Sequence, residues 1–147
     1  MWLAAASLLV ATTACGGGTE RGESVQNFME SAGPVEWITV SDMYDRAVSE
    51  IVIVCPYTTE SLIKDELGFN WPGAKSLARS LIDDSKQAVI AMHDGHVVEL
   101  EVMDYDVLHL CAMDVPNPTT LGGDTVLQVS PSTDVLAGTT YPVASIR

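Results

Sequence analysis

Residues 87–103 read QAVIAMHDGHVVELEVM and say more about the fold than any other stretch of the chain. Two apolar runs, 87–92 and 96–103, stand on either side of Asp94-Gly95. A two-residue Asp-Gly loop between apolar runs is typical of a β-hairpin, because both turn residues tolerate a positive φ. The stretch therefore predicts a pair of antiparallel strands.

Further strands are predicted on both sides of this hairpin. Residues 51–55 (IVIVC) are an unbroken apolar run rich in β-branched side chains, which is typical of a strand covered on both faces. Residues 107–113 (VLHLCAM) predict a third strand of a meander, and residues 36–40 (EWITV) a short strand before the hairpin. Residues 125–129 (TVLQV) predict a last strand at the sheet edge, after a long loop over 114–124.

Helices are predicted where a capping residue precedes apolar residues at helical spacing. Ser24 stands at the start of the first such segment and Thr58 or Thr59 at the start of the third. Gly33 and Gly68 stand at their C-terminal ends. Four helices are predicted on this basis, over residues 25–32, 43–48, 60–67 and 74–83.

The order of these elements predicts an α+β (or α/β) fold. We expect a single compact domain over residues 24–130, with a mixed sheet, an antiparallel hairpin or meander and three to four short helices. A signal peptide (1–14) and a flexible, glycine-rich tether (15–23) precede it. Residues 131–147 form a tail whose weak periodicity predicts no particular structure.

The charge balance excludes several classes of partner. Among 147 residues, 7 are basic and 20 are acidic, which gives a net charge of −13. A surface of that sign repels the phosphates of nucleic acids, so nucleic acid is excluded as a partner. It also repels anionic lipid headgroups, so contact with a membrane requires a covalent anchor.

The first fourteen residues are typical of a signal peptide. Residues 2–14 (WLAAASLLVATTA) are apolar, uncharged and too short to span a membrane, which takes about 20 residues. Cys15 is then followed by three glycines, which disfavour continuation as a buried helix. The segment therefore predicts an exported chain.

Thr12-Thr13-Ala14-Cys15 resembles the lipobox of bacterial lipoproteins, in which a small residue precedes a cysteine that receives diacylglycerol and becomes the mature N-terminus. Ala14 and Cys15 match that motif, whereas Thr12 stands where the family has leucine. The resemblance implies lipid attachment (acyl chains such as palmitate) at Cys15 and a location at the outer face of the cell membrane. Ordinary signal cleavage, which leaves a soluble secreted protein, is the alternative.

The cysteine count agrees with lipidation. An exported chain with three cysteines, Cys15, Cys55 and Cys111, has one that intramolecular disulfides cannot use. Lipidation of Cys15 accounts for it and leaves Cys55 and Cys111 to form a disulfide in an oxidising compartment. A pair of buried, reduced thiols is the alternative.

A second resemblance covers residues 50–100. Residues 52–58 (VIVCPYT), a helix that closes on Leu67 and a glycine, Trp71, and the hairpin residues 94–98 (DGHVV) are similar to a set of small bacterial lipoproteins that share this pattern. The resemblance implies an envelope lipoprotein, and it implies no catalytic residue.

Two motifs contain residue types that can carry out chemistry. Cys55-Pro-Tyr-Thr resembles the Cys-Pro-Tyr-Cys site of glutaredoxins, with Thr58 in place of the second cysteine, and it raises an exported thiol–disulfide enzyme as the alternative function. His93 and His96 flank the hairpin turn, but a shared metal needs further ligands, and His109 is expected in a different strand. A structural turn and surface histidines are the preferred interpretations.

The sequence therefore assigns no catalytic residue, no metal site and no cofactor, and it leans against an enzyme. It predicts a cell-envelope lipoprotein that acts as a non-enzymatic binding or structural module. The expected partners are the membrane, through the lipid anchor, and an envelope protein or wall component.

Overall fold

The predicted hairpin is present. The structure is a computed structural model that describes residues 20–146. Strands β4 (Lys86–His93) and β5 (His96–Asp104) pair antiparallel, and Asp94 and Gly95 make the turn with φ values of 49° and 74°. Both values lie in the left-handed region that a tight two-residue hairpin loop requires.

The hairpin belongs to a five-stranded sheet in the order β1-β5-β4-β3-β6. β3 (Glu50–Val54) pairs antiparallel with β4 and with β6 (Thr119–Gly122), whereas β1 (Glu20–Arg21) joins β5 in parallel. Residues 51–54 of β3 are all buried, which confirms the prediction of a strand covered on both faces.

Helices α2 (Glu60–Leu67) and α3 (Ala74–Ser80) cover one face of this sheet. The N–H of Leu62 donates to the hydroxyl oxygen of Thr59 at the start of α2, and Gly68 ends the helix with a φ of 76°. Both features follow the capping pattern of the sequence. The apolar side chains between these helices and the sheet include Val52, Val54, Ile63, Leu77, Leu81 and Ile90.

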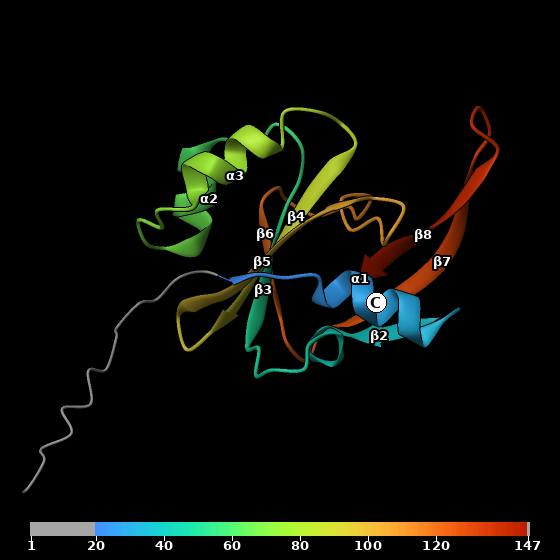
Figure 1. The fold of residues 1–147 in the computed structure, drawn as a ribbon, viewed down its shortest axis with the longest axis horizontal. Helices are drawn as coiled ribbons and strands as arrows, with labels where there is room; N and C mark the ends of the chain where they lie inside the picture. Colours follow the sequence, from blue (N-terminus) through green and yellow to red (C-terminus); the bar gives the residue numbers. More distant parts are fainter. Residues whose placement is uncertain (1–19, 147) are drawn as a thin grey trace, which may run out of the picture.

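Helix α1 (Ser24–Ala32) and a second sheet cover the opposite face. The second sheet is antiparallel and has the order β2-β7-β8, with bounds Trp37–Thr39, Val126–Asp134 and Thr139–Ile146. Figure 1 shows the layers, with α2 and α3 on one side of the five-stranded sheet and α1 and the second sheet on the other. The main core includes Val25, Ile38, Ile51, Val89, Leu110 and Leu127. The predicted α+β domain is confirmed.

The helix predicted over residues 43–48 is wrong. In its place a short 3-10 helix, η1 (Val40–Met43), is followed by irregular backbone. The N–H groups of Val40 and Ser41 donate to the carbonyl oxygens of Thr125 and Gly123. This segment is therefore held by distant backbone partners, which its own helical spacing does not reveal.

The strand predicted over residues 107–113 is also wrong. These residues form a loop with one isolated bridge, between His109 and Val143. The buried side chain of Gln87 takes the place of a strand partner: its amide nitrogen donates to the carbonyl of Leu108, and its oxygen accepts the N–H groups of Leu110 and Cys111. The backbone of the loop is thus satisfied without a strand ladder.

The C-terminal third departs furthest from the sequence prediction. Strand β6 arises within residues 114–124, which were expected to be a loop. β7 is the middle strand of its sheet and not a last edge strand, because residues 139–146 of the supposed tail pair with it as β8. No helix within residues 20–146 is long and apolar enough to cross a membrane.

Candidate functional site

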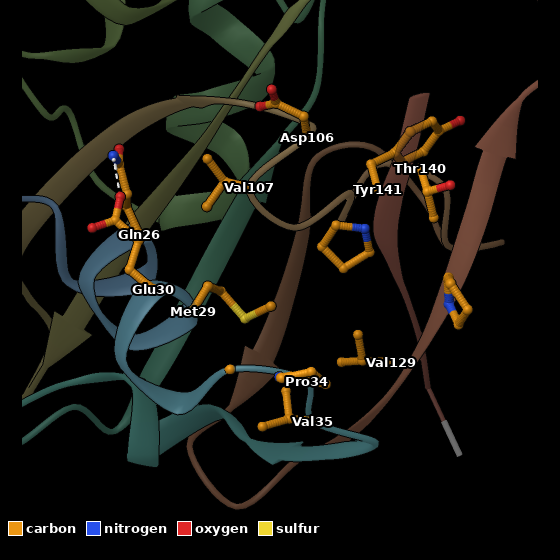
Figure 2. Close-up of a pocket in the computed structure, with 13 residues that line it drawn as sticks. Gln26, Met29, Glu30, Pro34, Val35, Asp106, Val107, Val129, Thr140 and Tyr141 are labelled. Atoms are coloured by element: carbon orange, nitrogen blue, oxygen red, sulfur yellow. Dashed lines mark hydrogen bonds between the residues drawn. The ribbon is translucent and has the colours of Figure 1, made fainter. Parts of the chain in front are cut away.

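A groove with a volume of about 560 Å³ opens between helix α1 and the β7–β8 hairpin. We call it the α1–β8 groove. Its apolar walls are formed by Met29, Val35, Val107, Val129, Pro131 and Pro142. Its polar rim is formed by Gln26, Glu30, Asp106, Thr140 and Tyr141. Figure 2 shows the Met29 side chain extending from α1 into the space that faces the strands.

The groove exists because β7 and β8 are longer than their neighbour. β2 pairs with β7 only at residues 126–128, whereas β7 and β8 stay paired out to Asp134 and Thr139. Beyond β2 the two strands continue as a ribbon that projects from the molecule (Figure 1). On the other side, α1 ends and Gly33, with a φ of 67°, turns the chain toward Val35. The ribbon and the end of α1 thus enclose apolar surface without filling the space between them.

Aromatic side chains brace one wall of the groove. The rings of Tyr105 and His109 stack with their centroids 4.7 Å apart. The ring of His109 is tilted against that of Tyr141, with the two centroids 5.8 Å apart. Tyr141 belongs to β8 and lines the groove, so the stack joins the strand to the loop that carries Asp106. Partial burial lowers the pKa of His109, which favours its neutral form.

The segments around the groove carry negative charge. Residues 22–45 and 87–146 contain no lysine or arginine, so apart from histidines every charged side chain in them is acidic. Most cations of the described chain lie elsewhere, among them Lys64, Lys75 and Arg79 on the helices that cover the opposite face of the five-stranded sheet. The groove is therefore an apolar site with an anionic rim.

A second hollow, of about 530 Å³, lies between α1, α3 and the outer part of β5. Arg21, Asn27, Ser76 and Ser80 are among its lining residues, together with the buried Glu101. Both carboxylate oxygens of Glu101 already accept backbone N–H groups at the start of α1. Glu101 therefore holds a helix in place, and we do not assign a ligand to this hollow.

Of the predicted site residues, Cys55 and Cys111 are brought together and Cys15 lies outside the described residues. A disulfide joins Cys55 to Cys111, with a Cα–Cα distance of 5.7 Å. Cys55 follows β3 directly, but Cys111 lies in the loop held by Gln87 and not in the strand predicted over residues 107–113. Residues 55–58 form the turn into α2, where the hydroxyl of Thr58 donates to the carbonyl of Cys55.

The three histidines, and the aspartates Asp83 and Asp104, do not form one cluster. His93 and His96 face each other across the hairpin turn, while His109 lies in the aromatic stack. Within residues 20–146 no group of three or more His, Cys, Asp or Glu side chains is arranged to hold a metal ion. Asp83 accepts the N–H of Ser85 in its own turn, and Asp104 pairs with Lys86 at 2.6 Å.

Sequence reasoning missed the groove itself. Its residues come from α1, the 105–107 loop, β7 and β8, and no local motif joins them. The one available signal was the absence of lysine and arginine from residue 87 to residue 146, which indicates an acidic surface. Comparison with protein-family models, with curated proteins and with solved structures finds no match to this chain.

Proposed function

We propose that this protein is a lipid-anchored envelope protein whose domain binds a partner in the α1–β8 groove without catalysing a reaction. The observation that carries the proposal is the groove, an open hollow of about 560 Å³ with mostly apolar walls. Concave apolar surface with a few polar groups at its rim is the usual form of a ligand site. Leaving such surface uncovered is unfavourable in water, which favours a binding role for it.

Features outside the groove support export. Residues 2–14 have the length and composition of a signal peptide, and Ala14-Cys15 matches the end of a lipobox. The disulfide between Cys55 and Cys111 fits an oxidising compartment.

The position of the groove suits an anchored binding protein. In Figure 1 the described chain begins with a blue segment that lies away from the red tip of the β7–β8 hairpin. At that tip Val135 is 90% exposed and Leu136 is 100% exposed. An anchor at Cys15 would therefore leave the projecting hairpin, and the groove beside it, directed away from the membrane and available to a partner.

The groove can be tested with the neutral, apolar dye Nile red. We expect the full-length protein to bind the dye and Thr140→Trp to weaken binding at least about fivefold, because the indole fills the mouth of the groove from an exposed strand position that tolerates aromatic residues. The measurement is a fluorescence titration.

Thr139→Trp is the matched control. Thr139 is the preceding residue on β8, is exposed, and does not line the groove. Side chains alternate along a strand, so its indole points to the face opposite Thr140 and Pro142. Equal dye binding by the wild type and Thr140→Trp would show that the groove is not a ligand site and would remove the basis of the proposed function.

A further inference from the structure

We propose that the α1–β8 groove takes a cationic segment of a partner polypeptide, with an apolar side chain in the groove and lysine or arginine side chains against its rim. This inference rests on the binding function proposed above and adds the chemistry of the partner. Three features of the described residues carry it: the acidic rim, the acidic segments behind it, and the aromatic wall.

The rim places carboxylates from two different elements at the mouth of an apolar hollow. Glu30 comes from α1 and Asp106 from the loop after β5, and both side chains are exposed. Gln26 donates a hydrogen bond to Glu30 at 2.9 Å, drawn in Figure 2, which helps to hold that carboxylate in position. A ligand with an apolar group and flanking positive charges would satisfy both surfaces at once.

The negative charge of the rim is not offset by the segments that build the groove. Residues 22–45 and 87–146 supply its lining and contain no lysine or arginine. Arg21, Arg46, Lys86 and Arg147 border these segments in the sequence. Lys86 already pairs with Asp104 at 2.6 Å, and Arg46 lies 3.7 Å from Glu99. A cationic ligand would therefore be attracted to this side of the molecule, and an anionic one repelled.

The aromatic wall adds faces that attract cations. Tyr141 lines the groove, and Tyr105 stacks on His109 beside it. Asp104 and Asp106 flank Tyr105 in the sequence. Partial burial and the nearby carboxylates of Asp83 and Asp84 raise the pKa of the Tyr105 phenol, which agrees with a negative potential on this wall. Lysine and arginine bind favourably over tyrosine rings in such surroundings.

The charge of the protein also favours a polypeptide over the other candidate occupants of the groove. With a net charge of −13, the chain repels nucleic acids, anionic lipid surfaces and a second copy of itself. A polypeptide can present apolar and cationic side chains a few ångströms apart, as the groove and its rim require. A neutral wall glycan offers neither group.

The test uses the full-length chain, purified in detergent, and three fluorescently labelled synthetic nonapeptides. Each contains a central Trp-Leu pair, flanked by lysines in the first, by glutamates in the second and by serines in the third. Fluorescence anisotropy gives the dissociation constants at two salt concentrations. We expect the lysine peptide to bind at least about tenfold more tightly than the glutamate peptide, and the difference to shrink as salt rises.

Two protein variants locate the effect. The double variant Glu30→Gln/Asp106→Asn should weaken binding of the lysine peptide by about three- to tenfold, because it removes both rim charges. The control Asp65→Asn/Asp94→Asn changes the net charge equally, on the exposed surface of α2 and at the tip of the β4–β5 hairpin, and should have little effect. If both double variants weaken binding of the lysine peptide equally, the attraction depends only on the net charge of the protein and not on the two rim carboxylates, and the inference is overturned.

The peptide series separates this inference from the proposed function. If all three peptides bind equally and Thr140→Trp blocks them all, the cationic partner is wrong while the groove remains a binding site. If the lysine peptide binds Thr140→Trp as well as it binds the wild type, it does not use the groove, and the inference fails. Binding of peptidoglycan fragments but not of the lysine peptide would likewise overturn it in favour of a wall component.

Discussion

At the scale of single residues, two buried carboxylates replace the helix cap that the sequence predicts. Glu99 and Glu101 on β5 are only 3% and 2% exposed. Glu101 accepts the N–H groups of Val25 and Gln26 at 2.8 and 3.0 Å, and Glu99 accepts that of Ser24 at 3.2 Å. These are the N–H groups that the first turn of a helix cannot pair internally, and the carboxylates also complement the positive end of its dipole.

Replacing Glu101 should therefore destabilise the fold. We expect Glu101→Leu to lower the free energy of unfolding by about 2 kcal/mol or more, because it leaves two N–H groups without acceptors. Glu101→Gln keeps one acceptor oxygen and should cost less. Denaturant unfolding provides the measurement, and Met103→Leu on the same face of β5 is the control that changes no polar group. A Glu101→Leu variant as stable as the wild type would show that the cap contributes nothing.

The same site gives a pH dependence of defined sign. Burial raises the pKa of Glu101; its two N–H donors oppose that effect, and the neighbouring Glu99 and Glu23 carboxylates add to it. Because the folded-state pKa lies above the unfolded value of 4.5, protonation of Glu101 stabilises the folded protein. This stabilisation is fully present below about pH 4.5 and is lost as pH rises through the folded-state pKa.

We therefore expect the stability difference between the wild type and Glu101→Gln to be larger at pH 4.5 than at pH 7. Burial raises the pKa of the neighbouring Tyr44 phenol, which therefore stays neutral in both proteins over this pH range. A difference that shrinks on acidification would contradict the raised pKa.

At the scale of elements, the β7–β8 ribbon has features that discourage the addition of a further strand. Pro131 on β7 pairs directly with Pro142 on β8, and neither has an N–H to donate. On the outer side of β8, the backbone N–H of His109 donates to the carbonyl of Pro142, and the backbone carbonyl of His109 accepts the N–H of Ala144. The ribbon is therefore suited to contact a partner through side chains in the groove and less suited to pair backbone with backbone.

The loop over residues 107–113 is tied to the five-stranded sheet by a polar contact and a covalent one. Gln87 binds its backbone from β4, and the disulfide joins Cys111 to Cys55 after β3. Because Val107 and the aromatic stack belong to this region, the two ties also support one wall of the groove. Gln87 is fully buried, so its hydrogen bonds are not exchanged for water in the folded protein.

Reduction of the disulfide should destabilise the protein. The two cysteines are 56 residues apart, and closing a loop of that length restricts the unfolded chain enough to stabilise the fold by about 4 kcal/mol. Thermal unfolding with and without reductant measures the loss. The double variant Cys55→Ser/Cys111→Ser is the control, because its stability should not respond to reductant. Rapid alkylation of Cys55 in the native, non-reduced protein would contradict the bond.

At the scale of the whole molecule, the core clusters lie in separate layers, and the helical lysines lie on one side while acidic residues occur on both. The side formed by α2 and α3 carries Lys64, Lys75 and Arg79, whereas the second sheet contains no lysine or arginine. Figure 1 shows the projecting β7–β8 hairpin away from the blue start of the described chain. A chain held at its N-terminus would thus expose its acidic, grooved side to whatever lies beyond the membrane.

Lipid attachment is testable at this scale. We expect Cys15→Ala to abolish labelling by a fatty acid such as palmitate and to move the protein from the detergent phase to the medium or to leave it unprocessed, because the net charge of −13 disfavours direct binding to anionic lipid headgroups. Metabolic labelling with detergent-phase partition is the measurement. Thr12→Leu, which restores the usual lipobox residue, is the control and should still be labelled. A wild-type mature N-terminus that mass spectrometry finds unmodified would contradict the anchor.

The sequence by itself determined the elements whose signals are local. The β4–β5 hairpin follows from Asp94-Gly95, β3 from an unbroken apolar run, and α2 from Thr59 and Gly68 at its two ends. In each case the residues that specify the element lie within it or next to it, so turn chemistry and capping are sufficient. The Cys55–Cys111 pairing was expected on count and compartment, without knowledge of the loop that holds Cys111.

Only the tertiary structure decided the rest. The two glutamates that cap α1 lie about 75 residues beyond it in the sequence, and alternation along β5 marks them as solvent-facing. Strand β8 and the groove likewise depend on pairing and packing between α1, the 105–107 loop and β7. Which buried polar groups find partners, and which apolar surface stays uncovered, depends on where distant segments meet. Local sequence patterns do not encode where those segments meet.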